Sequence, residues 1–233
     1  MIIAACSATR GQELRVTLLN GVKLRLLARL RGVARRTPAT SFIRALIDAA
    51  RDATNVDEVR AMMAEAIQRR FCTPGQILDE VRDGPVRHSQ LARKVALEIA
   101  DGIRSPAEGW LREAFIRFRV PPPRWNTVLR DAATGQIIAI PDALWANRCV
   151  IAEVDSRDCR LSPEDWNRTQ ERHTMLTALG FAVLHFALSR VKADPEAVCA
   201  EVMAALTASA SRRWPRAVTM ARTDDTTSRP CVA

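Results

Sequence analysis

The hydrophobic pattern of the chain changes near residue 102, and this change constrains the fold more than any other feature. Between residues 38 and 102, apolar side chains recur every three or four residues, as in 42–47 and 59–67, which is the period of amphipathic helices. Beyond residue 102, short β-rich runs alternate with helical stretches. We therefore expect an α/β (α+β) protein with a mainly helical region (1–102), a second domain (103–208) and a disordered polar tail (209–233).

Local signals place the individual elements. Asn55 is a helix N-cap candidate, and Thr73 precedes a proline in the first helical position. Near the N-terminus we expect a strand over 14–21 and a basic amphipathic helix over 23–36, whose charged face is either solvated or turned to DNA or a membrane surface. In the second domain we expect, in order, a helix from 105, strands over 125–131, 136–141 and 149–155, a helix over 162–180, a strand over 181–187 and a helix over 194–207.

Carboxylates accompany two of the apolar runs. Asp142 follows the run 136–141, and Glu153 and Asp155 lie near the end of the run 149–155. Two adjacent strands that end in this way would bring Asp142 and Glu153 within reach of one divalent cation. Clustered oxygen ligands suit Mg²⁺ or Mn²⁺, and such an ion beside a phosphate promotes its hydrolysis.

Each carboxylate also has a purely structural interpretation. Asp142 follows a proline and is typical of a turn. Glu153 lies in an otherwise apolar strand, where an unpaired carboxylate is costly, and an ion pair with Arg148 or Arg172 would satisfy it. Asp155 is equally suited to capping the strand end.

Composition favours a polyanionic partner and a reducing compartment. The net charge is +9 and 32 of the 35 basic residues are arginine, whose planar guanidinium binds phosphate bidentately, although a GC-rich genome enriches arginine too. The six cysteines are scattered without a CxxC pair, as in a reduced cytoplasmic protein. The chain has no apolar run of 18 residues, so we expect no membrane-spanning helix.

Several stretches of the second domain, taken in order, resemble the PD-(D/E)XK nuclease superfamily, in its very-short-patch-repair (Vsr) endonuclease-like branch. The resemblance implies a restriction-endonuclease-like domain with a four-stranded mixed sheet flanked by helices. Members of this branch often carry a helical or antitoxin-like region ahead of that domain. The similar stretches are residues 105–108, 141–145, 153–155 and 162–166, Arg172, and residues 179–184.

The resemblance assigns roles to three carboxylates. It implies that Asp142 and Glu153 hold Mg²⁺ or Mn²⁺ and that Glu108 on the first helix assists. Asp155 is a candidate for a third metal ligand or for a cap of the strand end. Glu108 is also the third helical residue of a capping box that begins at Ser105, where its carboxylate would bind a backbone N–H instead. Asp155 occupies the position that is Lys in most of the superfamily and commonly Asp in this branch.

Two departures from the branch concern the segment after Asp155. Relatives carry a glycine and then a histidine there, whereas this chain has Ser156 and, over 157–160, two arginines but no histidine. Arg157, Arg160 and Arg172 are candidates to bind DNA phosphates and to stabilise charge during cleavage.

Two functions follow from these observations. The first is a Mg²⁺-dependent DNA endonuclease that hydrolyses phosphodiester bonds in DNA repair or phage defence. The alternative is a catalytically degenerate nuclease fold that acts as a DNA-binding or antitoxin-like regulator, with the helical region as a candidate surface for a protein partner.

Overall fold

A computed structural model of the chain describes residues 42–155 and 163–221. It divides the chain into two compact units, Met1–Ser105 and Pro106–Ala233. The elements expected over 14–21 and 23–36 lie outside the described residues. No helix of the described residues is long and apolar enough to cross a membrane.

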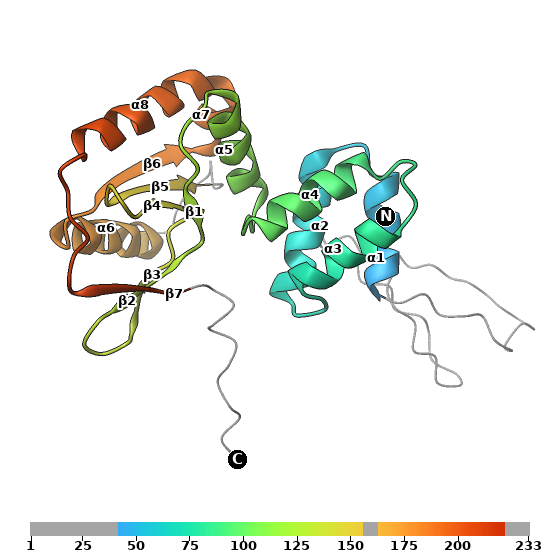
Figure 1. Ribbon diagram of the computed structural model, residues 1–233, viewed down its shortest axis with the longest axis horizontal. Helices are drawn as coiled ribbons and strands as arrows, with labels where there is room; N and C mark the ends of the chain where they lie inside the picture. The colour runs from blue at the N-terminus through green and yellow to red at the C-terminus, as the bar shows by residue number, and fades with distance from the viewer. Residues whose placement is uncertain (1–41, 156–162, 222–233) are drawn as a thin grey trace, which may run out of the picture. The chain divides into compact units, whose positions relative to one another are not determined.

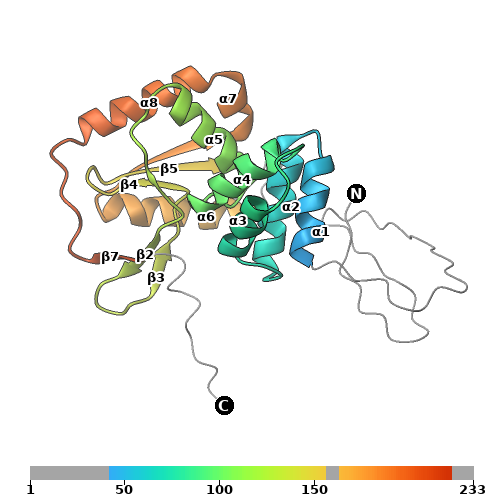
Figure 2. The same cartoon turned by 45° about the vertical axis from the view of Figure 1, so that its right-hand side comes forward.

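The described part of the first unit is helical. Its core contains Leu46, Met63 and Ile77, and α1 and α2 lie side by side (Figure 2). The side chain of Asn55 accepts a hydrogen bond from the N–H of Asp57, which confirms the predicted N-cap. The four helices are α1 (Phe42–Asp52), α2 (Val56–Gln68), α3 (Pro74–Asp83) and α4 (Gln90–Ala100).

Thr73 begins helix α3 as predicted. Its hydroxyl accepts a hydrogen bond from the N–H of Gln76, and the Gln76 side chain accepts one in return from the N–H of Thr73. Pro74 occupies the first turn, where no N–H is needed. This reciprocal capping box satisfies donors that the helix itself cannot.

An ion pair is buried between helices α2 and α4. The guanidinium of Arg60 donates to both carboxylate oxygens of Glu98, from Nε at 2.8 Å and from Nη2 at 2.8 Å. Both side chains are 1% exposed, and Arg60 also contacts Asp57 at 3.2 Å. Because neither charge can reach water, each depends on the other for its stabilisation.

The second unit is built on a four-stranded mixed sheet, which confirms the predicted α+β class. Strand β4 runs antiparallel to both β1 and β5, whereas β5 and β6 are parallel. Helix α6 connects β5 to β6, as a parallel pair requires. The sheet order is β1 (Arg124–Trp125), β4 (Ala143–Trp145), β5 (Val150–Asp155) and β6 (Ala182–Ala187).

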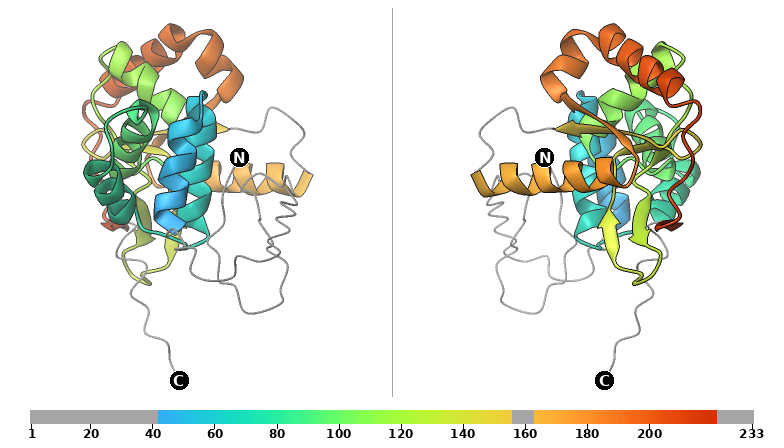
Figure 3. Two further views of the ribbon diagram at one scale, coloured as in Figure 1. Left: turned by 90° about the vertical axis from the view of Figure 1, so that its right-hand side faces the viewer. Right: turned by 90° about the vertical axis from the view of Figure 1, so that its left-hand side faces the viewer.

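Helices cover both faces of this sheet (Figure 1). One face carries Val150 and Ala152 and packs against α5 (Pro106–Arg117), α7 (Leu188–Ala193) and α8 (Pro195–Ala208). The other carries Ile151 and packs against Leu176 of α6 (Pro163–Ala178). Figure 3 shows α6 on this side of the strands. Alternate residues of β5 therefore enter different cores.

A second sheet departs from the sequence-based expectation. The predicted hairpin forms, but β2 (Val128–Asp131) and β3 (Ile137–Ala139) join β7 (Val218–Ala221) in a separate sheet of order β3-β2-β7. The single strand expected over 125–131 is interrupted at Asn126, whose φ of 49° is left-handed. The prediction of disorder from residue 209 is wrong through residue 221, because β7 pairs antiparallel with β2.

Candidate functional site

A row of polar residues crosses the four-stranded sheet on the face that α6 covers. The antiparallel register pairs Ala143 of β4 with Ala152 of β5, so one step further Asp142 lies beside Glu153. The parallel register of β5 and β6 pairs Glu153 with His185. Since side chains alternate along a strand, Glu153 points to the opposite face from Ala152.

Asp142 is fixed by the backbone of the neighbouring strand. Its Oδ2 accepts a hydrogen bond from the N–H of Val154 at 2.8 Å. Burial raises the pKa of its carboxyl, the Val154 N–H and Arg172 oppose that shift, and Asp155 adds to it. The sequence predicted that Asp142 ends a strand, and this is wrong: it immediately precedes β4, since the run 136–141 belongs to the second sheet.

Glu153 is the least satisfied group in the row. It is buried at 7% exposure, and its Oε1 has no hydrogen-bond partner among the described residues. Burial, together with the negative charge of Asp142, raises its pKa to about 7, although Arg172 opposes the shift. Of the two predicted ion pairs, the one with Arg172 forms, at 3.7 Å from Nη2 to Oε2.

Asn126 connects two of the predicted site residues. Its Nδ2 donates to Oε2 of Glu108 at 2.6 Å, and its backbone N–H donates to the carbonyl of Asp142 at 3.0 Å. Glu108 lies on α5, is 5% exposed, and raises the pKa of Glu153 through its charge. The structure therefore brings Glu108, Asp142 and Glu153 together.

Sequence reasoning did not identify Asn126. The usable signal was an asparagine between two short β-rich runs, because asparagine tolerates the left-handed conformation better than other non-glycine residues. This conformation turns the chain at the end of β1. Asn126 then serves both Glu108 and Asp142.

The remaining predicted residues differ in their placement. Asp155 is exposed at the end of β5, close enough to raise the pKa of Asp142. Arg172 comes from α6 with its side chain 40% exposed. Next to it, His173 packs on His185 with ring centroids 5.0 Å apart. Arg157 and Arg160 lie outside the described residues.

The donor set fits a hard divalent cation in its chemistry. Carboxylate oxygens are the ligands that Mg²⁺ and Mn²⁺ prefer, and the buried Oε1 of Glu153 lacks any other partner among the described residues. In that same part of the chain, no three His, Cys, Asp or Glu side chains are grouped closely enough to hold an ion. Binding would therefore need backbone oxygens or water as additional ligands.

No protein-family model, no curated protein and no solved structure matches this chain. The functional assignment therefore depends on the site itself.

Proposed function

We propose that the protein is a Mg²⁺- or Mn²⁺-dependent DNA endonuclease in which Asp142 and Glu153 hold the ion. The observation that carries this proposal is the buried Oε1 of Glu153, which has no partner among the described residues. An unsatisfied buried carboxylate oxygen costs stability. Such a cost is typical of functional sites.

Three carboxylates lie close enough together for their negative charges to repel one another. Asp142 raises the pKa of Glu153, and Glu108 adds to that effect. In a site that serves only stability, one cation would be expected for each buried anion. Here Arg172 is the one described cation that forms an ion pair with Glu153, at 3.7 Å, and its side chain is 40% exposed. A divalent cation would relieve this repulsion.

A bound Mg²⁺ or Mn²⁺ would neutralise charge on the scissile phosphate and lower the pKa of an attacking water. In this mechanism the Val154 N–H holds Asp142 in place as a ligand, and Asn126 holds Glu108 beside the site. Arg172, freed from Glu153, contacts the phosphate and stabilises its charge. The products are a 5′-phosphate and a 3′-hydroxyl, as the family resemblance implies.

Nicking of supercoiled plasmid tests the proposal. We expect cleavage with Mg²⁺ or Mn²⁺ that is lost in Glu153→Ala and in Asp142→Ala. Glu196→Ala is the matched control, because Glu196 is an exposed carboxylate in the first turn of α8. The proposal fails if neither ion supports cleavage of single-stranded, nicked or mismatched DNA, or if the Glu153 variant cleaves at the wild-type rate.

A second candidate function is a catalytically degenerate, DNA-binding regulator. The ion pair of Arg172 with Glu153 favours it, since a guanidinium already partly neutralises the carboxylate that a metal would bind. Asp155 stands where most of the superfamily has Lys, and its exposed position would accept that side chain. We expect DNA binding without cleavage in this case, and Asp155→Lys would be the variant that restores activity. Either function belongs to the cytoplasm, where DNA is accessible and thiols stay reduced.

A further inference from the structure

Arginines gather at the end of the four-stranded sheet that lies away from the carboxylates. Arg148 is in the turn between β4 and β5. The next residue, Cys149, accepts a hydrogen bond through its carbonyl from the N–H of Ala182, at the start of β6. The turn before β5 and the start of β6 therefore meet at this end of the sheet.

The segment between α8 and β7 adds further arginines to the same place. Nη1 of Arg212 donates to the carbonyl of Gly180, and the Trp214 ring packs edge-on against Phe181 at 5.3 Å. Burial raises the pKa of Cys149, and the charge of Arg212 opposes that shift, which agrees with their closeness. The distal arginine cluster consists of Arg148, Arg212, Arg213 and Arg216.

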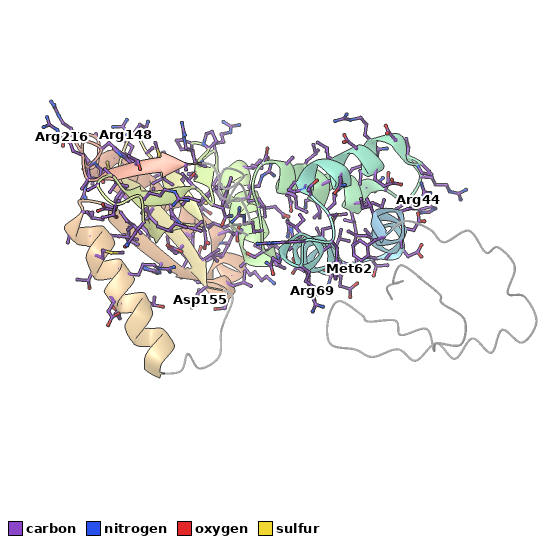
Figure 4. The ribbon with its side chains drawn as sticks, turned by 90° about the horizontal axis from the view of Figure 1, so that it is seen from below. Arg44, Met62, Arg69, Arg148, Asp155 and Arg216 are labelled. Carbon is purple, nitrogen blue, oxygen red and sulfur yellow. The ribbon has the colours of Figure 1, made fainter. Side chains whose placement is uncertain are left out.

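Figure 4 labels Arg148 and Arg216 at the same end of the second unit, away from Asp155. Strand β5 separates the two ends. Its six residues span roughly 17 Å at about 3.3 Å for each step. This length corresponds to about five base pairs of duplex DNA at 3.4 Å each.

The cluster has almost no acidic residues around it. The segments that meet at this end of the sheet, residues 146–150, 179–183 and 209–221, contain no Asp or Glu. Among the described residues, Arg148, Arg213 and Arg216 form no ion pair. Asp131 lies on the neighbouring β2, but its carboxylate accepts hydrogen bonds from the N–H groups of Ala133 and Thr134.

Guanidinium groups whose positive charge is not balanced by nearby carboxylates are suited to binding phosphates. Arg213 and Arg216 are exposed, and arginine binds phosphate oxygens through a planar set of donors. Trp214 does not offer its N–H to a base, because that group donates to the carbonyl of Val218 at 2.7 Å. The cluster is therefore equipped to contact the sugar–phosphate backbone.

We propose that the distal arginine cluster is a second contact for the phosphate backbone of double-stranded DNA, separate from the carboxylate site. The choice of DNA as the partner rests on the proposed function. The cluster holds the duplex independently of its sequence and positions it along β5, so that binding and cleavage depend on different residues.

Binding without cleavage tests this inference. A fluorescent 20-base-pair duplex is titrated with full-length protein in EDTA, over a range of salt concentrations, and anisotropy is recorded. The test variant is R148Q/R213Q/R216Q. The control is R117Q/R119Q/R124Q, which removes the same charge from exposed positions elsewhere in the second unit.

We expect the test variant to bind on the order of 100-fold more weakly near 0.1 M salt. The slope of the logarithm of its binding constant against the logarithm of salt concentration should be less steep by about 2.7, which corresponds to three lost phosphate contacts at about 0.9 each. The control should remain within about threefold of wild type, since net charge alone acts weakly at this salt concentration. Circular dichroism of both variants checks that the fold is retained.

Four outcomes would overturn the inference: equal losses in both variants, no loss in the test variant, no binding of the duplex by wild-type protein, or dependence on the cluster for phosphatidylserine vesicles but not for DNA. The inference and the proposed function fail separately. Cluster-dependent binding without any metal-dependent cleavage contradicts only the nuclease. Cleavage that needs Glu153, with unchanged binding by the test variant, contradicts only the cluster.

Discussion

Replacing Glu153 with Gln should stabilise the metal-free second unit at alkaline pH. Burial and the charge of Asp142 raise the pKa of Glu153 from 4.5 to about 7. The folded state therefore binds this proton more tightly than the unfolded state does. The contribution to stability is complete below pH 4.5, falls as pH rises towards 7, and is lost above that value.

The pKa values give the size of the effect. A difference of about 2.5 corresponds to on the order of 3 kcal/mol in the free energy of unfolding. Gln fills nearly the same space and cannot ionise. We therefore expect Glu153→Gln to exceed wild type by about that amount at pH 8.5 and to match it near pH 4.5, since there the wild-type side chain is largely protonated as well.

Urea unfolding in EDTA, followed by tryptophan fluorescence, measures this difference. All five tryptophans, at positions 110, 125, 145, 166 and 214, belong to the second unit, so the signal does not report the helical unit directly. Glu196→Gln is the control for loss of an exposed carboxylate. Identical pH dependence in wild type and Glu153→Gln would refute the reasoning, and a variant less stable at pH 8.5 would mean that the ion pair with Arg172 outweighs burial.

Other predictions concern single contacts in both units. Asn126→Ala should destabilise the second unit by about 1–3 kcal/mol, because it leaves the buried Glu108 carboxylate without its 2.6 Å donor; fluorescence-monitored unfolding measures this, and an unchanged midpoint would contradict it. Arg60→Leu should cost about 3–5 kcal/mol in the helical unit, since it strands the buried charge of Glu98. Adding Glu98→Leu should recover much of that loss, as followed by far-ultraviolet circular dichroism. Thr73→Ala should cost about 1 kcal/mol through loss of the capping box, measured in the same way.

The sequence predicted those parts of the fold whose signals are local. Asn55 and Thr73 lie where capping chemistry dictates the start of a helix. The continuous apolar run at the start of 149–155 identified β5, because the sequence of a strand that is buried on both faces is apolar at successive positions. These features need no knowledge of distant residues.

Which sheet a strand joins depends on residues far away in the sequence, and the sequence did not predict it here. Nothing in 136–141 distinguishes a strand that pairs with β5 from one that pairs with β2, since both need only an apolar, extended segment. The short β4 (Ala143–Trp145) was consequently missed. Asp142 and Glu153 were still predicted to be neighbours, and they are. However, Asp142 immediately precedes a strand and does not end one.

The selection of three carboxylates that lie near one another came from the sequence, but the residue that connects them did not. Glu108, Asp142 and Glu153 were selected because they match, in order, the acidic positions of the family that the chain resembles. Asn126 became visible only when β1 and β4 were paired, because its role consists of contacts to two residues that are 18 and 16 positions away.

The pairing of β7 with β2 has a practical consequence for preparing the protein. Shortening the chain at residue 208, which its polar C-terminal composition invites, would remove Trp214 from Phe181 and leave β2 as the edge of a two-stranded ribbon. Unpaired edges recruit other chains, and an isolated hairpin is barely stable in water. We expect a fragment that ends at residue 208 to aggregate. A fragment that retains residues through 221 keeps β7 paired with β2.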